Sequence, residues 1–274
     1  MEEGRLVTAP GGPASLGGRR ASLAAALRPA HLQAHHEGEY VGQESFISAG
    51  EILDLARAAG VDAGTGVLDL CCGCGGPALH LARQTGCRIV GVDRSPEAIH
   101  LARTSAEHQG LGRRATFIVA EALCPPMDAA SFDVVLLYET MLAFEDKRRL
   151  VRVVRKLLRP GGRFGLTLEE GRPLSSAERR RVPGSEEVWL IPESEFRGLL
   201  EAAGFRIHRV EDHTAAHAEV AGRLAATLQS DRAAIVAALG SQASNELLRA
   251  HERWTEWLNA RRVRKLAVVA QRLY

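Results

Sequence analysis

Short apolar runs alternate with amphipathic stretches through the middle of the chain. The runs are rich in Val, Ile, Leu and Phe and are too short for core helices, so we interpret them as buried strands. They cover residues 66–71, 88–92, 115–120, 132–138 and 163–168. Stretches of helical length separate them, as the crossovers between parallel strands require. The pattern predicts an α/β fold with a mostly parallel sheet and helices on both faces.

Gly, Pro and Ser mark where helices between these strands begin and end. Residues 46–59 carry apolar positions at helical spacing and stop at Gly60. Ser95 and Pro96 supply an N-cap and a first-turn proline for another helix. Further helices are predicted at 77–84, 146–158 and 191–203.

The last third of the chain breaks this alternation. Residues 205–210 predict a sixth strand and residues 263–270 a seventh. Between them, residues 214–260 have the pattern of two or three helices, interrupted near Gly240. We expect this helical insertion to lie above the sheet as a cap, because the segments on either side of it belong to the core.

The chain is therefore expected to have four parts. Residues 1–30 are rich in Gly, Ala, Pro and Arg with little apolar periodicity, which indicates a flexible N-terminal arm. The core with an N-terminal lid helix covers 31–213, the cap insertion 214–260, and the last core strand 261–274. Because such an arm can reach a neighbouring subunit, we keep a homo-oligomer as an alternative to a monomer.

A glycine-rich turn joins the first strand to its helix. It reads Asp69-Leu-Cys-Cys-Gly73-Cys-Gly75-Gly-Pro77, and glycine there lets backbone approach a ligand closely. Asp93 ends the second strand, 20 residues after Gly73. Ligands of open α/β sheets bind at the carboxyl ends of the strands, where such a carboxylate can accept hydrogen bonds from both ribose hydroxyls. These two features alone are compatible with NAD and with S-adenosyl-L-methionine (SAM).

Four further segments decide between these two cofactors. Together with the turn, and in the same order along the chain, they resemble the class I SAM-dependent methyltransferases of the small-molecule type. Asp69-x-Cys71-x-Gly73-x-Gly75 matches the family's acid-x-Gly-x-Gly-x-Gly loop, with Cys71 in place of the first glycine. The other matching segments are Val92-Asp93-Arg94-Ser95, Glu121-Ala122, 131–135 and 157–163. The resemblance covers residues 40–170 well and the last strand more loosely. It implies a Rossmann-like seven-stranded sheet and SAM as cofactor.

The resemblance also implies roles for individual residues. The turn would hold the methionine part of SAM, Asp69 its amino group, Asp93 the ribose, and the Glu121-Ala122 pair the adenine. A Tyr-x-Gly-Gln stretch at 40–43 resembles one that folds over the cofactor in some small-molecule methyltransferases. The expected cofactor contacts are Tyr40, Gln43, Asp69, Cys71, Gly73, Gly75, Asp93, Arg94, Glu121, Ala122 and Tyr138.

Acceptor chemistry is expected at the ends of strands four and five. Tyr138-Glu139 and Glu169-Glu170 follow those strands. A carboxylate there can take a proton, hold an ammonium group or stabilise a developing cation, while ordinary loop solvation explains each one equally well. The candidate catalytic residues are Tyr40, Tyr138, Glu169 and Glu170.

A metal site is not expected. His213 and His217 stand four residues apart on a predicted helix, but zinc needs further ligands that the sequence does not place. The cluster Cys71-Cys72-x-Cys74 lies in a strand and turn that already have a function.

Composition narrows the partners and the compartment. With 35 basic and 33 acidic residues the net charge is +2, which gives no bulk attraction to nucleic acid or membranes. The five cysteines lack a disulfide-scaffold spacing, which favours a reduced, cytoplasmic setting. Strand four is followed by Tyr138-Glu139-Thr140-Met141 rather than the Asn/Asp-Pro-Pro-Tyr/Phe stretch common in methylases of base amino groups.

We therefore expect an enzyme that transfers a methyl group from SAM to the N, O or C atom of a small molecule, such as a specialised metabolite. An NAD(P)-dependent oxidoreductase and a non-catalytic SAM-fold binding protein are the alternatives.

Overall fold

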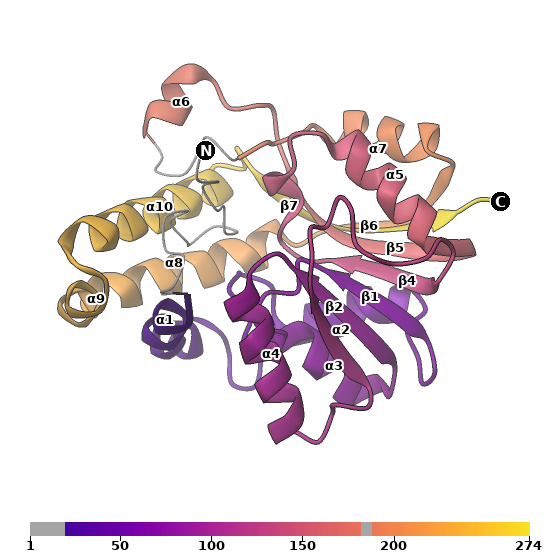
Figure 1. The fold of residues 1–274 in the computed structure, drawn as a ribbon. Helices are drawn as coiled ribbons and strands as arrows, with labels where there is room; N and C mark the ends of the chain where they lie inside the picture. The colour runs from indigo at the N-terminus through magenta and orange to yellow at the C-terminus, as the bar shows by residue number, and fades with distance from the viewer. Residues whose placement is uncertain (1–19, 182–187) are drawn as a thin grey trace, which may run out of the picture.

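A single sheet organises the computed structural model, which describes residues 20–181 and 188–274 (Figure 1). In this part of the chain seven strands pair in the order β3-β2-β1-β4-β5-β7-β6. The strands are β1 (Gly66–Leu70), β2 (Arg88–Asp93), β3 (Ala115–Val119), β4 (Phe132–Leu137), β5 (Leu158–Glu170), β6 (Phe205–Asp212) and β7 (Arg264–Arg272). β7 runs antiparallel to β5 and β6, and the other pairs are parallel. The predicted seven-stranded, mostly parallel sheet is confirmed.

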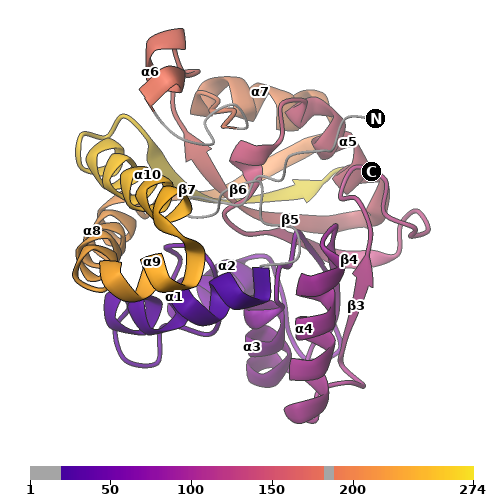
Figure 2. The same ribbon diagram turned by 60° about the vertical axis from the view of Figure 1, so that its left-hand side comes forward.

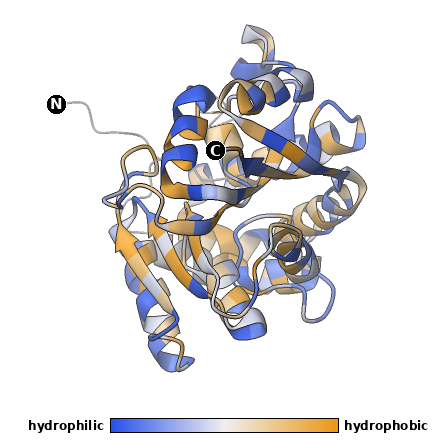
Figure 3. Cartoon of the chain, turned by 90° about the vertical axis from the view of Figure 1, so that its right-hand side faces the viewer, coloured by the Kyte–Doolittle hydropathy of each residue, from blue (hydrophilic) through white to orange (hydrophobic). Residues whose placement is uncertain are grey.

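Helices cover both faces of this sheet because successive side chains of a strand point to opposite sides. Val67 packs in a cluster with α2 (Ala49–Ala58), α3 (Gly76–Thr85) and α4 (Pro96–His108). Its neighbour Leu68 packs in another cluster with α5 (Lys147–Leu157) and α7 (Glu193–Ala202). Figure 3 shows hydrophobic residues gathered along the strands. The apolar runs of the sequence are therefore strands buried on both faces.

One helix start has the cap that the sequence predicts, and a second has a cap that was not predicted. The Ser95 side chain accepts a hydrogen bond from the backbone N–H of Ala98, with Pro96 in the first turn. At α2 the Ser48 side chain accepts from the N–H of Glu51, and the Glu51 carboxylate accepts from the N–H of Ser48. This capping box satisfies two backbone donors at once. It also fixes the position of the Glu51 carboxylate.

The helical insertion predicted at 214–260, named the cap, forms a separate group of helices beside the sheet (Figure 2). It contains α8 (Thr214–Ser230), α9 (Arg232–Leu239) and α10 (Ser241–Asn259). The helix break comes at Gly240, whose φ of 82° is in the left-handed region that glycine tolerates. The predicted interruption is thus correctly placed. The remaining short elements are α6 (Ser176–Arg181) and the 3-10 helix η1 (Met141–Ala143).

The N-terminal arm is shorter than the sequence indicates. Residues 20–30, predicted as part of a flexible arm, belong to helix α1 (Arg20–Ala34), which packs on the cap. Leu27, Ala30 and Ala34 are buried in the same apolar cluster as α8 and α10. Two of these three residues are alanine, whose small side chain contributes little to a hydrophobic pattern. The periodicity is therefore weak although the segment forms a helix. Residues 1–19 of the predicted arm lie outside the described residues.

Helices of the described segments are all too short or too polar to cross a membrane.

Phe164 tests the packing of the sheet against α5 and α7. Its ring is fully buried, with the Phe205 ring centroid 6.3 Å away. Replacing a buried Phe by Ala loses apolar burial and leaves a cavity, so Phe164→Ala should lower the free energy of unfolding by about 3–5 kcal/mol in urea denaturation. The control is Leu32→Ala, because Leu32 is 51% exposed and should change it by less than about 0.5 kcal/mol. Equal effects of the two variants would contradict the packing described.

Candidate functional site

An open cavity of about 270 Å³ lies where the strand order reverses around β1. Its walls come from the carboxyl ends of β1, β2 and β4 and from the loop before α2, the position where open α/β sheets bind ligands. Among the predicted cofactor contacts, nine line it: Gln43, Asp69, Cys71, Gly73, Asp93, Arg94, Glu121, Ala122 and Tyr138. The structure therefore brings these residues together, and their contact with a cofactor stays a prediction.

The glycine-rich turn has the backbone that its sequence indicates. Cys71, Gly73 and Gly75 have φ values of 61°, 53° and 80°. A side chain on Gly73 would meet nothing within 4 Å, so this residue leaves its side of the cavity open. A side chain on Gly75 would come within 2.8 Å of the Ala102 Cβ and 2.9 Å of the Phe117 ring. Gly75 is outside the cavity lining, and glycine is needed there for packing; its contact with the cofactor stays a prediction.

Asp93 ties the two loops at the floor of the cavity together. One carboxylate oxygen accepts a hydrogen bond from the backbone N–H of Gly73 at 3.0 Å. The other accepts from the N–H of Ser95 at 2.9 Å. Each oxygen of a carboxylate has two lone pairs, so Asp93 keeps acceptor capacity for ligand hydroxyls.

Asp69 is a buried carboxylate with an unused oxygen. Its side chain is 1% exposed, and its Oδ2 has no hydrogen-bond partner among the described residues. Burial, and secondarily the negative charge of Asp93, raises the pKa of Asp69 to about 8. A buried polar group without a partner is costly, so this atom is suited to a donor or a cation that enters the cavity.

The polar side chains of the loop before α2 that were expected to contact the cofactor are engaged in contacts within the protein. Gln43 lines the cavity, but its side chain accepts from the N–H of Val41 and donates to the carbonyls of Glu39 and Ile47. It therefore holds the loop in shape. Tyr40 is outside the cavity lining, with its ring stacked on His31 of α1 at 5.3 Å. Tyr40 thus packs against α1, and its predicted place at the reacting centre stays a prediction.

Tyr138 forms a wall of the cavity. Its hydroxyl donates to the Ile52 carbonyl at 3.3 Å, and burial raises its pKa well above the ordinary value. The hydroxyl therefore stays protonated and fixes the ring between β4 and α2. This geometry makes Tyr138 a poor proton acceptor, whereas its position in the lining agrees with the predicted cofactor contact.

The strand-end carboxylates separate into three different environments. Glu139 lines the cavity, with its backbone at a φ of 53°, an uncommon conformation for a residue other than glycine. Glu169 is fully buried behind it and accepts a hydrogen bond from the N–H of Leu142. Glu170 pairs with Arg264 at 2.7 Å. Glu169 and Glu170 are both outside the cavity lining and both held in ion pairs, and their catalytic role stays a prediction.

Lys265 holds the first two of these carboxylates. Its ammonium lies 2.6 Å from an oxygen of Glu139 and 3.1 Å from one of Glu169, and all three side chains are buried. Burial opposes charge on Glu139, but Lys265 outweighs it and lowers the pKa of this carboxyl below its ordinary value. The sequence analysis missed Lys265. The available signal was a lysine within the apolar pattern of the last strand, in register with Glu169.

Apolar side chains complete the other end of the cavity. Phe144 and Trp189 contribute to the lining near Glu139 and Tyr138. The guanidinium of Arg179 lies 4.7 Å from the centre of the Trp189 ring, within cation–π range. The cavity thus combines acidic groups at the glycine-rich turn with an aromatic wall.

Comparison with known proteins identifies the family. Residues 67–162 match the model of a methyltransferase domain. The 27-O-demethylrifamycin SV methyltransferase of Amycolatopsis mediterranei is 31% identical over 185 residues, which are 65% of this chain and 68% of that protein. The chain belongs to the class I SAM-dependent methyltransferase family. The resemblance inferred from the glycine-rich turn and the four segments that follow it is therefore confirmed.

Other methyltransferases match over a smaller share. Methyltransferase GfsG of Streptomyces halstedii is 38% identical over 125 residues, 45% of each chain. Ajmaline N-methyltransferase of Rauvolfia serpentina is 28% identical over 156 residues, 53% of this chain and 54% of that protein. The chain spans about half the length of these two relatives.

Solved structures of the methyltransferase fold agree with the architecture. The [4+2]-cyclase SpnF has a TM-score of 0.73 at 21% identity, covering 94% of this chain and 97% of that chain. Phosphoethanolamine N-methyltransferase 2 of Haemonchus contortus, in complex with SAM, has a TM-score of 0.75 at 19% identity, covering 96% and 62%. At these identities the likeness concerns the fold.

Asp69 predicts a pH dependence of stability. Because its pKa is about 8 in the folded protein and 3.8 as a free side chain, the folded state retains a proton that the unfolded chain releases between these values. This group therefore costs stability as the pH rises from 4 to 8. The unfolding free energy of Asp69→Asn relative to the native protein should increase over that range, by at most about 1.4 kcal/mol per pH unit. Urea denaturation at several pH values measures it.

The matched control is Asp128→Asn, which changes an exposed aspartate. Its stability should follow that of the native protein at every pH. A difference between Asp69→Asn and the native protein that does not change with pH would contradict the raised pKa of Asp69.

Proposed function

We propose that this protein binds SAM in the cavity at the end of β1 and transfers its methyl group to a small-molecule acceptor. The unpartnered, buried carboxylate of Asp69 is the observation that carries the proposal. With a pKa of about 8, Asp69 is mostly protonated at neutral pH when no cation is near it. The ammonium or sulfonium group of SAM would favour its ionised form and compensate the negative charge that results. Membership of the methyltransferase family supports the same cofactor.

The proposed placement follows from the polarity of the walls. The methionine part of SAM would lie along the backbone at Gly73, with its ammonium toward Asp69. The ribose hydroxyls would donate to Asp93, and the adenine would lie by Glu121 and Ala122. These residues line one cavity, which supports a single ligand spanning them.

The acceptor would occupy the aromatic end of the cavity. Phe144 and Trp189 suit an acceptor with apolar surface, and Glu139 supplies one ionised carboxylate beside it. That carboxylate can take the proton of an attacking hydroxyl or amine, or hold a positive charge that develops on the acceptor. Holding donor and acceptor in line supplies much of the remaining rate enhancement. The names of the relatives include O-, N- and C-methyltransferases. The acceptor atom of this protein is therefore to be identified from its methylated product.

The cysteines and the net charge bear on the surroundings of the enzyme. Cys71, Cys72, Cys74, Cys87 and Cys124 are all free thiols, which supports a reducing, cytoplasmic setting. The near-balanced charge supports a small-molecule partner rather than nucleic acid or a membrane, and the oligomeric state is to be measured by light scattering.

Calorimetric titration with SAM and with S-adenosylhomocysteine tests binding. Transfer is tested separately with methyl-labelled SAM and candidate acceptors. A structural neighbour is a [4+2]-cyclase, so cofactor binding without methyl transfer would support a SAM-fold protein of another activity and overturn the proposed transfer. Absence of binding at millimolar ligand, with NADH binding instead, would favour an oxidoreductase.

Asp93→Ala should weaken S-adenosylhomocysteine binding about 10- to 100-fold, because hydrogen bonds to a charged acceptor are worth about 1.5–3 kcal/mol. Asp93→Asn retains acceptor capacity in one atom and should lose less. Calorimetry measures both dissociation constants, and circular dichroism verifies folding. Unchanged affinity in a folded Asp93→Ala protein would exclude the ribose contact.

Glu139→Gln should lower kcat about 100-fold or more while changing the KM for SAM only a few-fold, because a proton acceptor acts in the chemical step. Glu170→Gln is the matched control. It makes the same change at a neighbouring strand end whose carboxylate is outside the cavity lining, and it should keep kcat within about 3-fold. Steady-state kinetics with the identified acceptor decide. Equal loss in the two variants would remove Glu139 from the reaction.

A further inference from the structure

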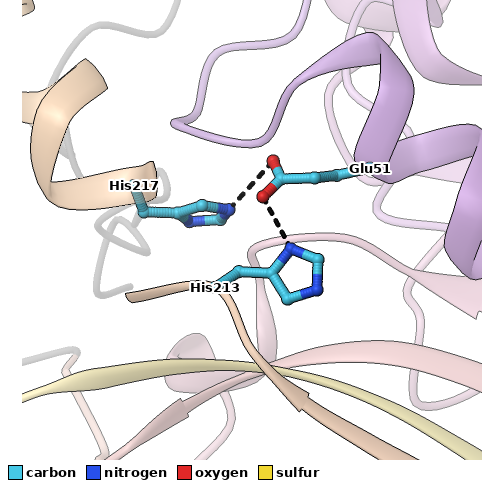
Figure 4. A group of neighbouring side chains, drawn as sticks. All are labelled: Glu51, His213 and His217. Atoms are coloured by element: carbon cyan, nitrogen blue, oxygen red, sulfur yellow. Dashed lines mark hydrogen bonds and ion pairs between the residues drawn. The ribbon is translucent and has the colours of Figure 1, made fainter. Parts of the chain in front are cut away.

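A second polar cluster lies outside the cavity, where α2 meets the start of the cap. It consists of Glu51, His213 and His217, and Figure 4 shows both imidazoles turned toward the one carboxylate. His213 Nδ1 lies 2.6 Å from Oε1 of Glu51, and His217 Nε2 lies 3.2 Å from Oε2. The cluster joins two segments of the chain, because Glu51 lies 162 residues before His213 and His217 follows His213 at the start of α8. One nitrogen from each histidine and one carboxylate oxygen lie within 4.8 Å of one another.

The outer nitrogen of each histidine faces a further carboxylate. His213 Nε2 is 3.4 Å from Glu211 Oε2. His217 Nδ1 is 3.7 Å from Glu139 Oε1. Both His217 Nδ1 and Glu139 Oε1 are buried, and neither has a hydrogen-bond partner among the described residues. Histidines that bind metals direct their other ring nitrogen to a carboxylate in this way, which fixes the ring and makes the inner nitrogen a better ligand.

The Glu51 carboxylate is held in place before any ligand binds. The capping box at the start of α2 fixes it through the N–H of Ser48, and its side chain is only 16% exposed. Within the described segments its ion-pair partners are His213 and His217, neither of which carries a permanent charge. Lys265, the nearby buried cation, is used by Glu139 and Glu169. A divalent cation would compensate the Glu51 charge fully.

A small cavity adjoins the cluster. The three side chains form part of its wall, together with Leu55, Thr167 and Lys265, and it is about the size that one water molecule needs. Two neutral imidazoles, one carboxylate and one water make the four-coordinate donor set that Zn²⁺ takes at sites with an open position.

We propose that Glu51, His213 and His217 bind one divalent transition-metal ion, with Zn²⁺ as the best match to these donors. The ion joins α2 of the core to the first turn of α8 in the cap. It also fixes the ring of His217, whose outer nitrogen faces the cavity residue Glu139. The site is independent of the proposed SAM binding, because none of the three ligands lines the larger cavity.

Metal binding by untagged, EDTA-treated protein tests the site without reference to activity. Titration with Zn²⁺ should show one equivalent bound, and excess Zn²⁺ should raise Tm by about 5 °C or more. Co²⁺ in place of Zn²⁺ should give visible absorption bands typical of four-coordinate cobalt.

Two mild variants assign the ligands. Glu51→Gln keeps an acceptor for the capping box, and His213→Asn changes a side chain that is 23% exposed, so both should fold. Each should weaken Zn²⁺ binding about 100-fold and abolish the Co²⁺ bands. His36→Ala is the matched control, because His36 is 70% exposed and pairs only weakly with Glu219, so its Zn²⁺ affinity should equal that of the native protein.

Two results would overturn the proposal. One is the absence of stoichiometric Zn²⁺ or Co²⁺ binding by the native protein, which would make the cluster a hydrogen-bonded network. The other is binding that survives in Glu51→Gln and His213→Asn, which would assign the metal to other groups such as the cysteines of the glycine-rich turn.

Discussion

The shared ammonium of Lys265 is the interaction on which the inner wall of the site depends. Glu139 lies just after β4, Glu169 near the end of β5 and Lys265 at the start of β7, so one buried cation joins two strands and the loop that follows a third. Buried charges are tolerated only when they are paired, and without Lys265 two carboxylates would face each other in a medium of low polarity. Glu169 in turn holds the N–H of Leu142, which positions the loop that follows β4. Lys265 and Glu169, which are outside the cavity lining, thus shape the cavity from behind.

This arrangement also explains how one fold separates two tasks. The acidic turn at Asp69 and Asp93 is built from the first two strands and is suited to a cationic, hydroxyl-bearing ligand. The aromatic wall at Phe144 and Trp189 comes from segments that follow β4 and precede α7. Changes in the second region can alter the acceptor while the first stays constant, which agrees with the range of named reactions among the relatives.

The sequence predicted those parts of the site that depend on local backbone. Strand ends, the glycine-rich turn and Asp93 are defined by short patterns, and the structure brings them to one cavity. Prediction from the sequence failed where tertiary packing determines the position of a side chain. The stacking of Tyr40 on His31 depends on helix α1, which the sequence did not predict. The pairing of Glu170 with Arg264 and the approach of Glu51 to two histidines involve segments distant in the chain. Helix α1 was missed because its buried stripe consists mostly of alanine, which periodicity hardly registers.

Cys71 gives the site a property that a glycine would not. It adopts a left-handed backbone conformation, and it lines the cavity that we propose holds the alkylating sulfonium of SAM. Only the thiolate form of cysteine is strongly nucleophilic. Burial, and then the charges of Asp93 and Asp69, raises the pKa of this thiol far above its ordinary value. The same acidic surroundings that attract a methyl donor therefore protect the protein from methylating itself.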